Sequence, residues 1–250
     1  MPPPSELLIE PSRDVLDAAR AWLARVRPVL GNEFLGAYIT GSALTQGFNP
    51  KRSDVNLLVV ARSLGGELLE RIAAAVPRPS RPPHVSPLFL TRAQIEKSLD
   101  SFPLEFLDMQ EGHLLLEGEN IFAGLAVPRT YLRLQCEREL RTKLIQLRQT
   151  FLLERDTRAL AATLASVASS FAALFRTLLR LRGETIPAHT ARVFEKVSDI
   201  YGLQGEGLLG AYAMRHEEKR PAADVVRSRY LAFLAELERL VGALDRLQVQ

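Results

Sequence analysis

Gly41, Ser42, Asp54 and Asn56 have the types and the spacing of residues that could bind a phosphorylated ligand. The apolar run 35–39 has the length and composition of a buried strand, and Gly41-Ser42 ends it. A strand that ends in Gly-Ser and turns into a helix presents backbone N–H groups, which attract an anion, and the Ser42 hydroxyl can donate as well. We therefore expect this turn to hold phosphate groups.

Asp54 and Asn56 begin a second apolar run, residues 54–60, which predicts another strand. Because side chains alternate between the faces of a strand, residues two apart point to the same side. Mg²⁺ prefers oxygen ligands and often binds protein carboxylate and substrate phosphate together. We expect Asp54 and Asn56 to hold Mg²⁺, or Mn²⁺, against the phosphates at the turn.

The apolar strand, Gly41-Ser42, a spacer of eleven residues and Asp54-Val55-Asn56-Leu57 together resemble a known signature. It is that of the DNA polymerase beta-like nucleotidyltransferase superfamily, which includes kanamycin nucleotidyltransferase-like and small bacterial nucleotidyltransferase proteins. The resemblance implies an enzyme that binds a nucleoside triphosphate with two metal ions. It also implies transfer of the nucleoside monophosphate to a hydroxyl acceptor, which the sequence does not identify.

The chain departs from that signature at Asn56, where the family has a second acid. An amide oxygen can contact a cation, but it brings no negative charge. A metal can stabilise transferring phosphate by several kcal/mol, and each ~1.4 kcal/mol of barrier is about tenfold in rate. Two interpretations stay open: a nucleotidyltransferase weakened at Asn56, or a catalytically inactive binding or interaction module on the same fold.

The resemblance also implies a third acid from a later strand. Residues 103–109, which we predict to be a strand, contain Glu105 and Asp108. Since these are three apart, they would face opposite sides of the sheet, so at most one could join Asp54. We favour Glu105 as the catalytic and metal-binding acid, because a charge within an apolar strand requires a partner. Asp108 is the alternative metal ligand, and a salt bridge or an exposed edge is the competing explanation.

The elements around these residues predict an α+β fold, in which a mixed sheet with flanking helices is followed by an all-α bundle. Residues 1–125 would form the nucleotidyltransferase-like domain and residues 126–250 the helical bundle. The predicted elements of the first domain are a strand at 85–91 and helices at 14–30, 64–76 and 92–99. The order of the two domains also resembles kanamycin nucleotidyltransferase-like proteins and small nucleotidyltransferases paired with helical partners.

Five helices are predicted in the second domain, at 130–155, 159–182, 188–201, 207–219 and 222–247. The apolar run 159–175 is shorter than the ~20 residues that a membrane span needs, so we expect a buried helix and no membrane contact. The last helix has an apolar seam that could pack in the bundle or form a homodimer. Its members are Tyr230, Leu234, Leu237, Val241 and Leu244.

Composition excludes several classes of protein. Of the 250 residues, 47% are hydrophobic and 24% charged, which is typical of a globular protein, and a net charge of +3 is too small to indicate nucleic-acid binding. Cys136 is the single cysteine, which excludes an intramolecular disulfide and a cysteine-based zinc site. The four histidines lack metal-ligand spacing. The first residues do not resemble a signal peptide, so we expect a cytoplasmic protein.

Overall fold

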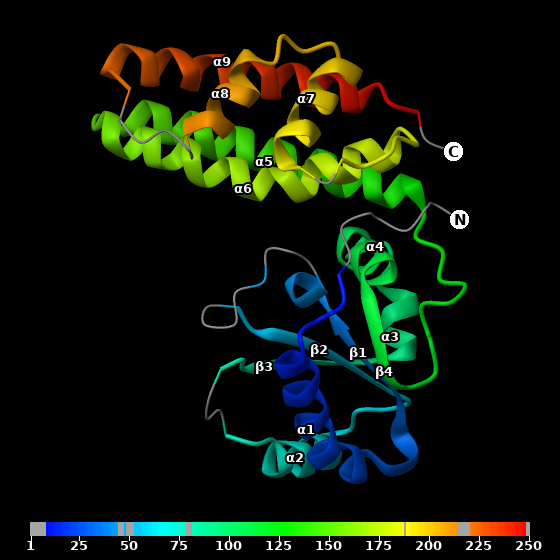
Figure 1. The fold of residues 1–250 in the computed structure, drawn as a ribbon. Coiled ribbons are helices and arrows are strands. Elements are labelled where there is room, and N and C mark those ends of the chain that lie inside the picture. Colours follow the sequence, from blue (N-terminus) through cyan, green and yellow to red (C-terminus); the bar gives the residue numbers. More distant parts are fainter. Residues whose placement is uncertain are drawn as a thin grey trace. The chain divides into compact units, whose positions relative to one another are not determined.

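The computed structural model describes residues 9–44, 48, 53–78, 82–187, 189–214 and 221–248. The chain divides into two compact units, Met1–Pro128 and Arg129–Gln250. The first unit combines a mixed sheet with helices, and the second is helical (Figure 1). This architecture confirms the predicted α+β class.

A four-stranded sheet with the order β3-β2-β1-β4 forms the centre of the first unit. The strands are β1 (Phe34–Thr40), β2 (Val55–Ala61), β3 (Val85–Thr91) and β4 (His113–Gly118). β1 pairs antiparallel with β2 and β4, whereas β2 and β3 are parallel. The helices are α1 (Arg13–Leu30), α2 (Gly66–Ala75), α3 (Arg92–Lys97) and α4 (Pro103–Glu111), with 3-10 turns η1 (Gly31–Glu33) and η2 (Gly41–Leu44).

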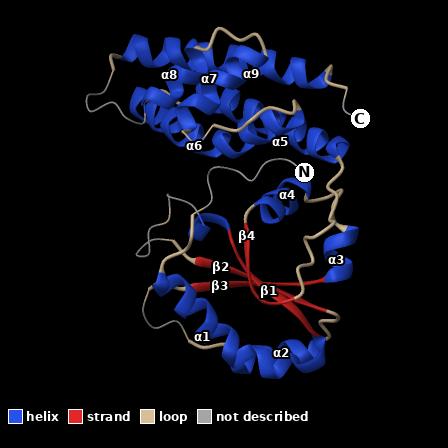
Figure 2. Cartoon of the chain, turned by 45° about the vertical axis from the view of Figure 1, so that its right-hand side comes forward, coloured by secondary structure: helices blue, strands red, loops and turns tan. Residues whose placement is uncertain are grey.

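Alternating side chains of β2 enter two cores, one on each face of the sheet. Leu57 and Val59 pack in the cluster that contains Trp22 of α1, which is 5% exposed and therefore a core residue. Leu58 and Val60 lie on the opposite face, in the cluster that contains residues of α3 and α4. The helices therefore cover both faces of the sheet (Figure 2).

The strand predicted at residues 103–109 is wrong, because this segment forms the helix α4. Pro103 occupies the first turn, where its fixed φ favours a helix and its missing N–H costs nothing. Pro103 and Phe106 are buried and Met109 packs against the same core, a three-residue spacing that suits a helix. The fourth strand is β4 instead, which begins at His113 and pairs with β1.

Five helices form the second unit: α5 (Arg129–Leu153), α6 (Thr157–Leu181), α7 (Thr190–Ile200), α8 (Glu206–Met214) and α9 (Ala223–Asp245). α6 contacts the other four. Among the described helices, α6 is the one whose length and hydropathy would allow it to cross a membrane. Its apolar side packs within the bundle, as the sequence predicts, with Leu160, Leu164, Phe171, Phe175 and Leu178 buried.

The apolar seam of α9 packs inside the bundle of a single chain. All five of its predicted members are buried. Gly207 of α8 touches α9 so closely that a Cβ there would lie 2.5 Å from the main-chain carbon of Ala232. Next to this contact the buried Glu236 accepts a hydrogen bond from the N–H of Leu208 at 2.8 Å. The side chain of Glu236 thereby satisfies a backbone donor in the first turn of α8.

Tyr38 connects the centre of the sheet to the loop after β4. Its side chain is fully buried, and its hydroxyl donates to the carbonyl of Glu119. The same oxygen accepts the N–H of Ile121 at 3.0 Å, and its ring meets Phe122 edge to face at 5.2 Å. Burial raises the pKa of Tyr38, so the hydroxyl stays protonated and can donate at neutral pH.

We predict that Tyr38→Phe lowers the free energy of unfolding of the first unit by about 1–3 kcal/mol, because two partly buried backbone groups, the carbonyl of Glu119 and the N–H of Ile121, lose their partner. Trp22 is the single tryptophan and belongs to this unit, so its fluorescence during urea denaturation reports on the first unit. Tyr131→Phe, at a 38% exposed position of α5, is the control and should leave the transition unchanged. Equal transitions for Tyr38→Phe and wild type would contradict this role.

Candidate functional site

The Gly41 turn touches the side chain of Asn56. β1 ends at Thr40, and the chain continues into η2 with Gly41 at φ 72°. A Cβ at Gly41 would lie 2.8 Å from Asn56 Nδ2, so glycine is required here by both backbone conformation and close approach. The structure therefore brings the turn and the start of β2 together.

The element that begins at Gly41 is a 3-10 helix of 4 residues, shorter than the helix expected from the sequence. A single turn aligns few peptide dipoles, so the macrodipole contributes less attraction for an anion than a long helix would. The polar groups at this turn are individual backbone N–H groups and the half-buried Ser42 side chain. Binding at this turn would depend on directed hydrogen bonds.

Asp54 and Asn56 lie at the exposed start of β2. Asp54 immediately precedes the strand, and Asn56 is the exposed residue within a strand whose other side chains are buried. The alternation of side chains along a strand would place the two on the same face if it extends to Asp54. β2 begins with a hydrogen bond of 2.7 Å from the N–H of Val55 to the carbonyl of His84, so β3 starts beside Asp54.

Asn56 belongs to a row of polar residues that crosses all four strands. It pairs with Ser86 of β3 and with Thr40 of β1, and Thr40 pairs in turn with His113 of β4. Neighbouring strands are about 4.8 Å apart, so this row is continuous across the sheet. None of its members is a carboxylate. On β3, the parallel neighbour of β2, Ser86 occupies the position beside Asn56, so an acid at that position would have to replace this serine.

Glu105 and Asp108 do not lie on the sheet. Both are exposed on α4, three residues apart, which places them as neighbours on a helix surface. Across the described ranges, no three acidic, histidine or cysteine side chains are grouped so that they could hold a metal ion. The structure thus does not unite Asp54, Glu105 and Asp108 in one such cluster, and their predicted roles stay predictions.

His113 and Ser86 were not expected at the site. His113 Nδ1 lies 3.0 Å from the carbonyl oxygen of Met109 and 3.1 Å from that of Gln110. Carbonyls only accept, so these contacts favour a proton on Nδ1. The sequence does contain a signal for both residues: each is a polar residue near the start of an apolar run, as Asn56 is.

The side chains at the start of β2 offer ligands for one hard cation and too few for two metal ions. Asp54 supplies a carboxylate and Asn56 an amide, and Mg²⁺ can bind through one or two carboxylates, water and substrate phosphate. Two adjacent divalent ions would repel each other unless several carboxylates lay between them. The donor set therefore suits a single cation whose remaining ligands come from phosphate oxygens and water.

We predict that Gly41→Ala lowers the stability of the first unit by about 1–2 kcal/mol, because an L-residue is strained at this positive φ. It should also displace the Asn56 amide, which an added Cβ would approach to 2.8 Å. Gly66→Ala is the matched control, since Gly66 opens α2 with no atom within 4 Å of an added Cβ. Urea denaturation followed by Trp22 fluorescence measures both variants, and equal losses would contradict a special requirement at Gly41.

No protein-family model matches the chain, and no curated protein matches its sequence. The chain is similar in structure to a spectinomycin adenyltransferase from Enterococcus faecialis, solved with ATP and spectinomycin. The identity is 13% and the TM-score 0.49, over 91% of this chain and 99% of that chain. A nucleotidyltransferase-like protein from Exiguobacterium sibiricum matches at 15% identity and a TM-score of 0.40, over 91% and 74% of the two chains.

Proposed function

We propose that this protein binds a nucleoside triphosphate with one Mg²⁺ or Mn²⁺ and transfers the nucleoside monophosphate to a hydroxyl acceptor. The observation that supports this most directly is the contact between the Gly41 turn and Asn56, next to Asp54. Hydrogen-bond donors for phosphate on the turn and oxygen ligands for a cation at the start of β2 thereby lie side by side. A triphosphate–cation complex requires this combination.

Each residue has a distinct part in this proposal. Backbone N–H groups of the turn and the Ser42 hydroxyl would hold the phosphates, and Asp54 would be the charged ligand of the cation. Asn56 would be a neutral ligand, so the site would attract a divalent ion less strongly than a pair of acids. The cation, when bound, would offset phosphate charge. The further acid predicted from the sequence, Glu105 with Asp108 as the alternative, lies on α4, and the proposal of one cation does not depend on it.

The acceptor is proposed only as a hydroxyl-bearing molecule, because no described residue selects among small molecules, nucleic acids and proteins. A cytoplasmic location and a homodimer through the helical unit also remain proposals. The homodimer would need a surface other than the α9 seam, which is buried within one chain.

We predict slow transfer by the wild type and at least about tenfold faster transfer by Asn56→Asp, because a second carboxylate strengthens cation binding. The assay incubates the full chain with labelled ATP, GTP, CTP or UTP and Mg²⁺ or Mn²⁺. It follows label on the protein itself, on RNA and on aminoglycosides. Asn32→Asp is the matched control, because it adds the same charge on η1, which precedes β1, whereas the Gly41 turn follows β1.

Asp54→Asn tests whether transfer occurs at this site, because it removes the proposed charged ligand while keeping the size of the side chain. Label transfer should fall to background in this variant. Transfer that persists in Asp54→Asn would place the chemistry elsewhere. If both the wild type and Asn56→Asp bind nucleotide without transferring label, the chain is a binding module and the proposed transfer is wrong.

A further inference from the structure

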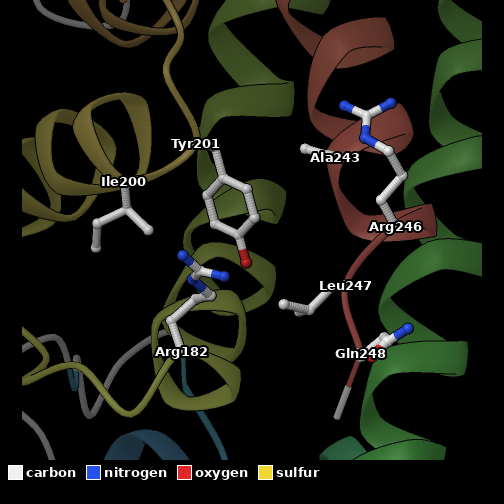
Figure 3. Close-up of a pocket in the computed structure, with 7 residues that line it drawn as sticks. All are labelled: Arg182, Ile200, Tyr201, Ala243, Arg246, Leu247 and Gln248. Atoms are coloured by element: carbon white, nitrogen blue, oxygen red, sulfur yellow. The ribbon is translucent and has the colours of Figure 1, made fainter.

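The second unit contains a cavity of about 440 Å³ where three helices end. Its lining residues come from the ends of α6, α7 and α9 (Figure 3), and they are Arg182, Ile200, Tyr201, Ala243, Arg246, Leu247 and Gln248. A second cavity of about 390 Å³ shares Tyr201, Ala243 and Arg246 with the first. The two cavities therefore lie next to each other and form one depressed region, with all of their lining residues in the helical unit.

The charges around this depression are mostly positive. Arg182 and Arg246 line the first cavity and Arg239 the second, and none of these three forms an ion pair with a residue that the structure describes. Glu238, on the wall of the second cavity, is paired with Arg148 at 2.9 Å. The guanidinium groups thus lack a neutralising carboxylate, which favours an anionic ligand and disfavours a cation.

Helix ends account for only part of this positive charge. Arg182 is the C-cap of α6 and Arg246 that of α9, where a cation offsets the partial negative charge of the last carbonyls. Each helix end carries about half an elementary charge, so three ends amount to about 1.5 negative charges. Three arginines exceed that sum and leave the depression with net positive charge.

Tyr201 provides an aromatic wall beside the charges. The guanidinium carbon of Arg182 lies 5.9 Å from the centre of its ring, and its hydroxyl donates to the carbonyl of Leu178 at 3.3 Å. Burial raises the pKa of Tyr201 to about 12, so the side chain is neutral at physiological pH and does not repel an anion. Ile200 and Leu247 add apolar surface to the same cavity.

We propose that this cavity is a second ligand site, which binds the oxyanion of a small molecule through Arg182 and packs its apolar part against Tyr201 and Leu247. Arg246 adds positive charge at the edge of the cavity, and its guanidinium group points away from Arg182 (Figure 3). Phosphate and carboxylate can each accept two parallel hydrogen bonds from one planar guanidinium group. An ammonium group cannot donate in this geometry. The site goes beyond the proposed transfer reaction, because all of its residues lie outside the unit that contains Gly41 and Asp54.

Calorimetric titration of the full chain at low ionic strength tests the site with phenyl phosphate, benzoate and inorganic phosphate. Comparison of phenyl phosphate with benzoate shows whether the site prefers phosphate or carboxylate. Comparison of phenyl phosphate with inorganic phosphate measures the contribution of the apolar ring. We expect saturable binding, tightest for a ligand with a ring, and at least about tenfold weaker binding in Arg182→Gln/Arg246→Gln. Arg158→Gln/Arg192→Gln removes the same charge from exposed positions of α6 and α7 and should bind as wild type.

Further variants separate this site from the triphosphate site and from loss of folding. Ser42→Ala should leave binding of the three probes unchanged, and Arg182→Gln/Arg246→Gln should leave label transfer unchanged. Arg182→Lys/Arg246→Lys keeps both charges, so it should melt as wild type while binding several-fold more weakly. The proposal is overturned by absence of saturable binding, by equal weakening in the control pair, or by loss of binding in Ser42→Ala.

Discussion

The antiparallel pairing of β1 with β2 is the constraint on which the candidate site depends. β1 is buried at every residue, and its register places Thr40 opposite Asn56. The chain must then leave the sheet through a turn that touches the Asn56 amide, where only glycine fits. A slip of one residue in this register would turn Asp54 and Asn56 toward the core under α1. The pairing that builds the core therefore also assembles the turn and the polar start of β2.

The charges at this end of the sheet differ from those of the three-acid site that the motif resembles. Asn56 is in line with Ser86, Thr40 and His113, all of them without a carboxylate, and Asp54 precedes the strand next to that row. Several carboxylates are needed to keep two divalent ions close together, whereas a single ion can take most of its ligands from phosphate and water. The side chains around Asn56 thus limit how much positive charge this part of the molecule can hold.

The helical unit uses arginine in two ways, and the difference lies in the neighbours. On one face of α5, Arg141 pairs with Glu137 at 2.8 Å, and Arg148 pairs with Glu238 of α9 at 2.9 Å. Such exposed pairs contribute little to stability and leave little charge for a ligand. Arg182 and Arg246 stand instead at helix ends beside a cavity, with no carboxylate among the described residues in ion-pair contact. Their charge is available to a ligand because the bundle provides no acidic partner there.

Local patterns in the sequence were sufficient to predict most elements, because alternation and helical periodicity act over a few neighbouring residues. The roles of Gly41, Ser42, Asp54 and Asn56 stay predictions. The local patterns failed at 103–109, since a short apolar segment satisfies either period; Pro103 in the first turn and the burial of Phe106 determine that it is a helix. Only the tertiary structure decided which residues flank Asn56. Strand order β3-β2-β1-β4 joins segments far apart in the chain, and it places Ser86 and His113 in the row while leaving Glu105 and Asp108 on α4. Long-range hydrogen bonding sets that order, and local spacing does not encode it.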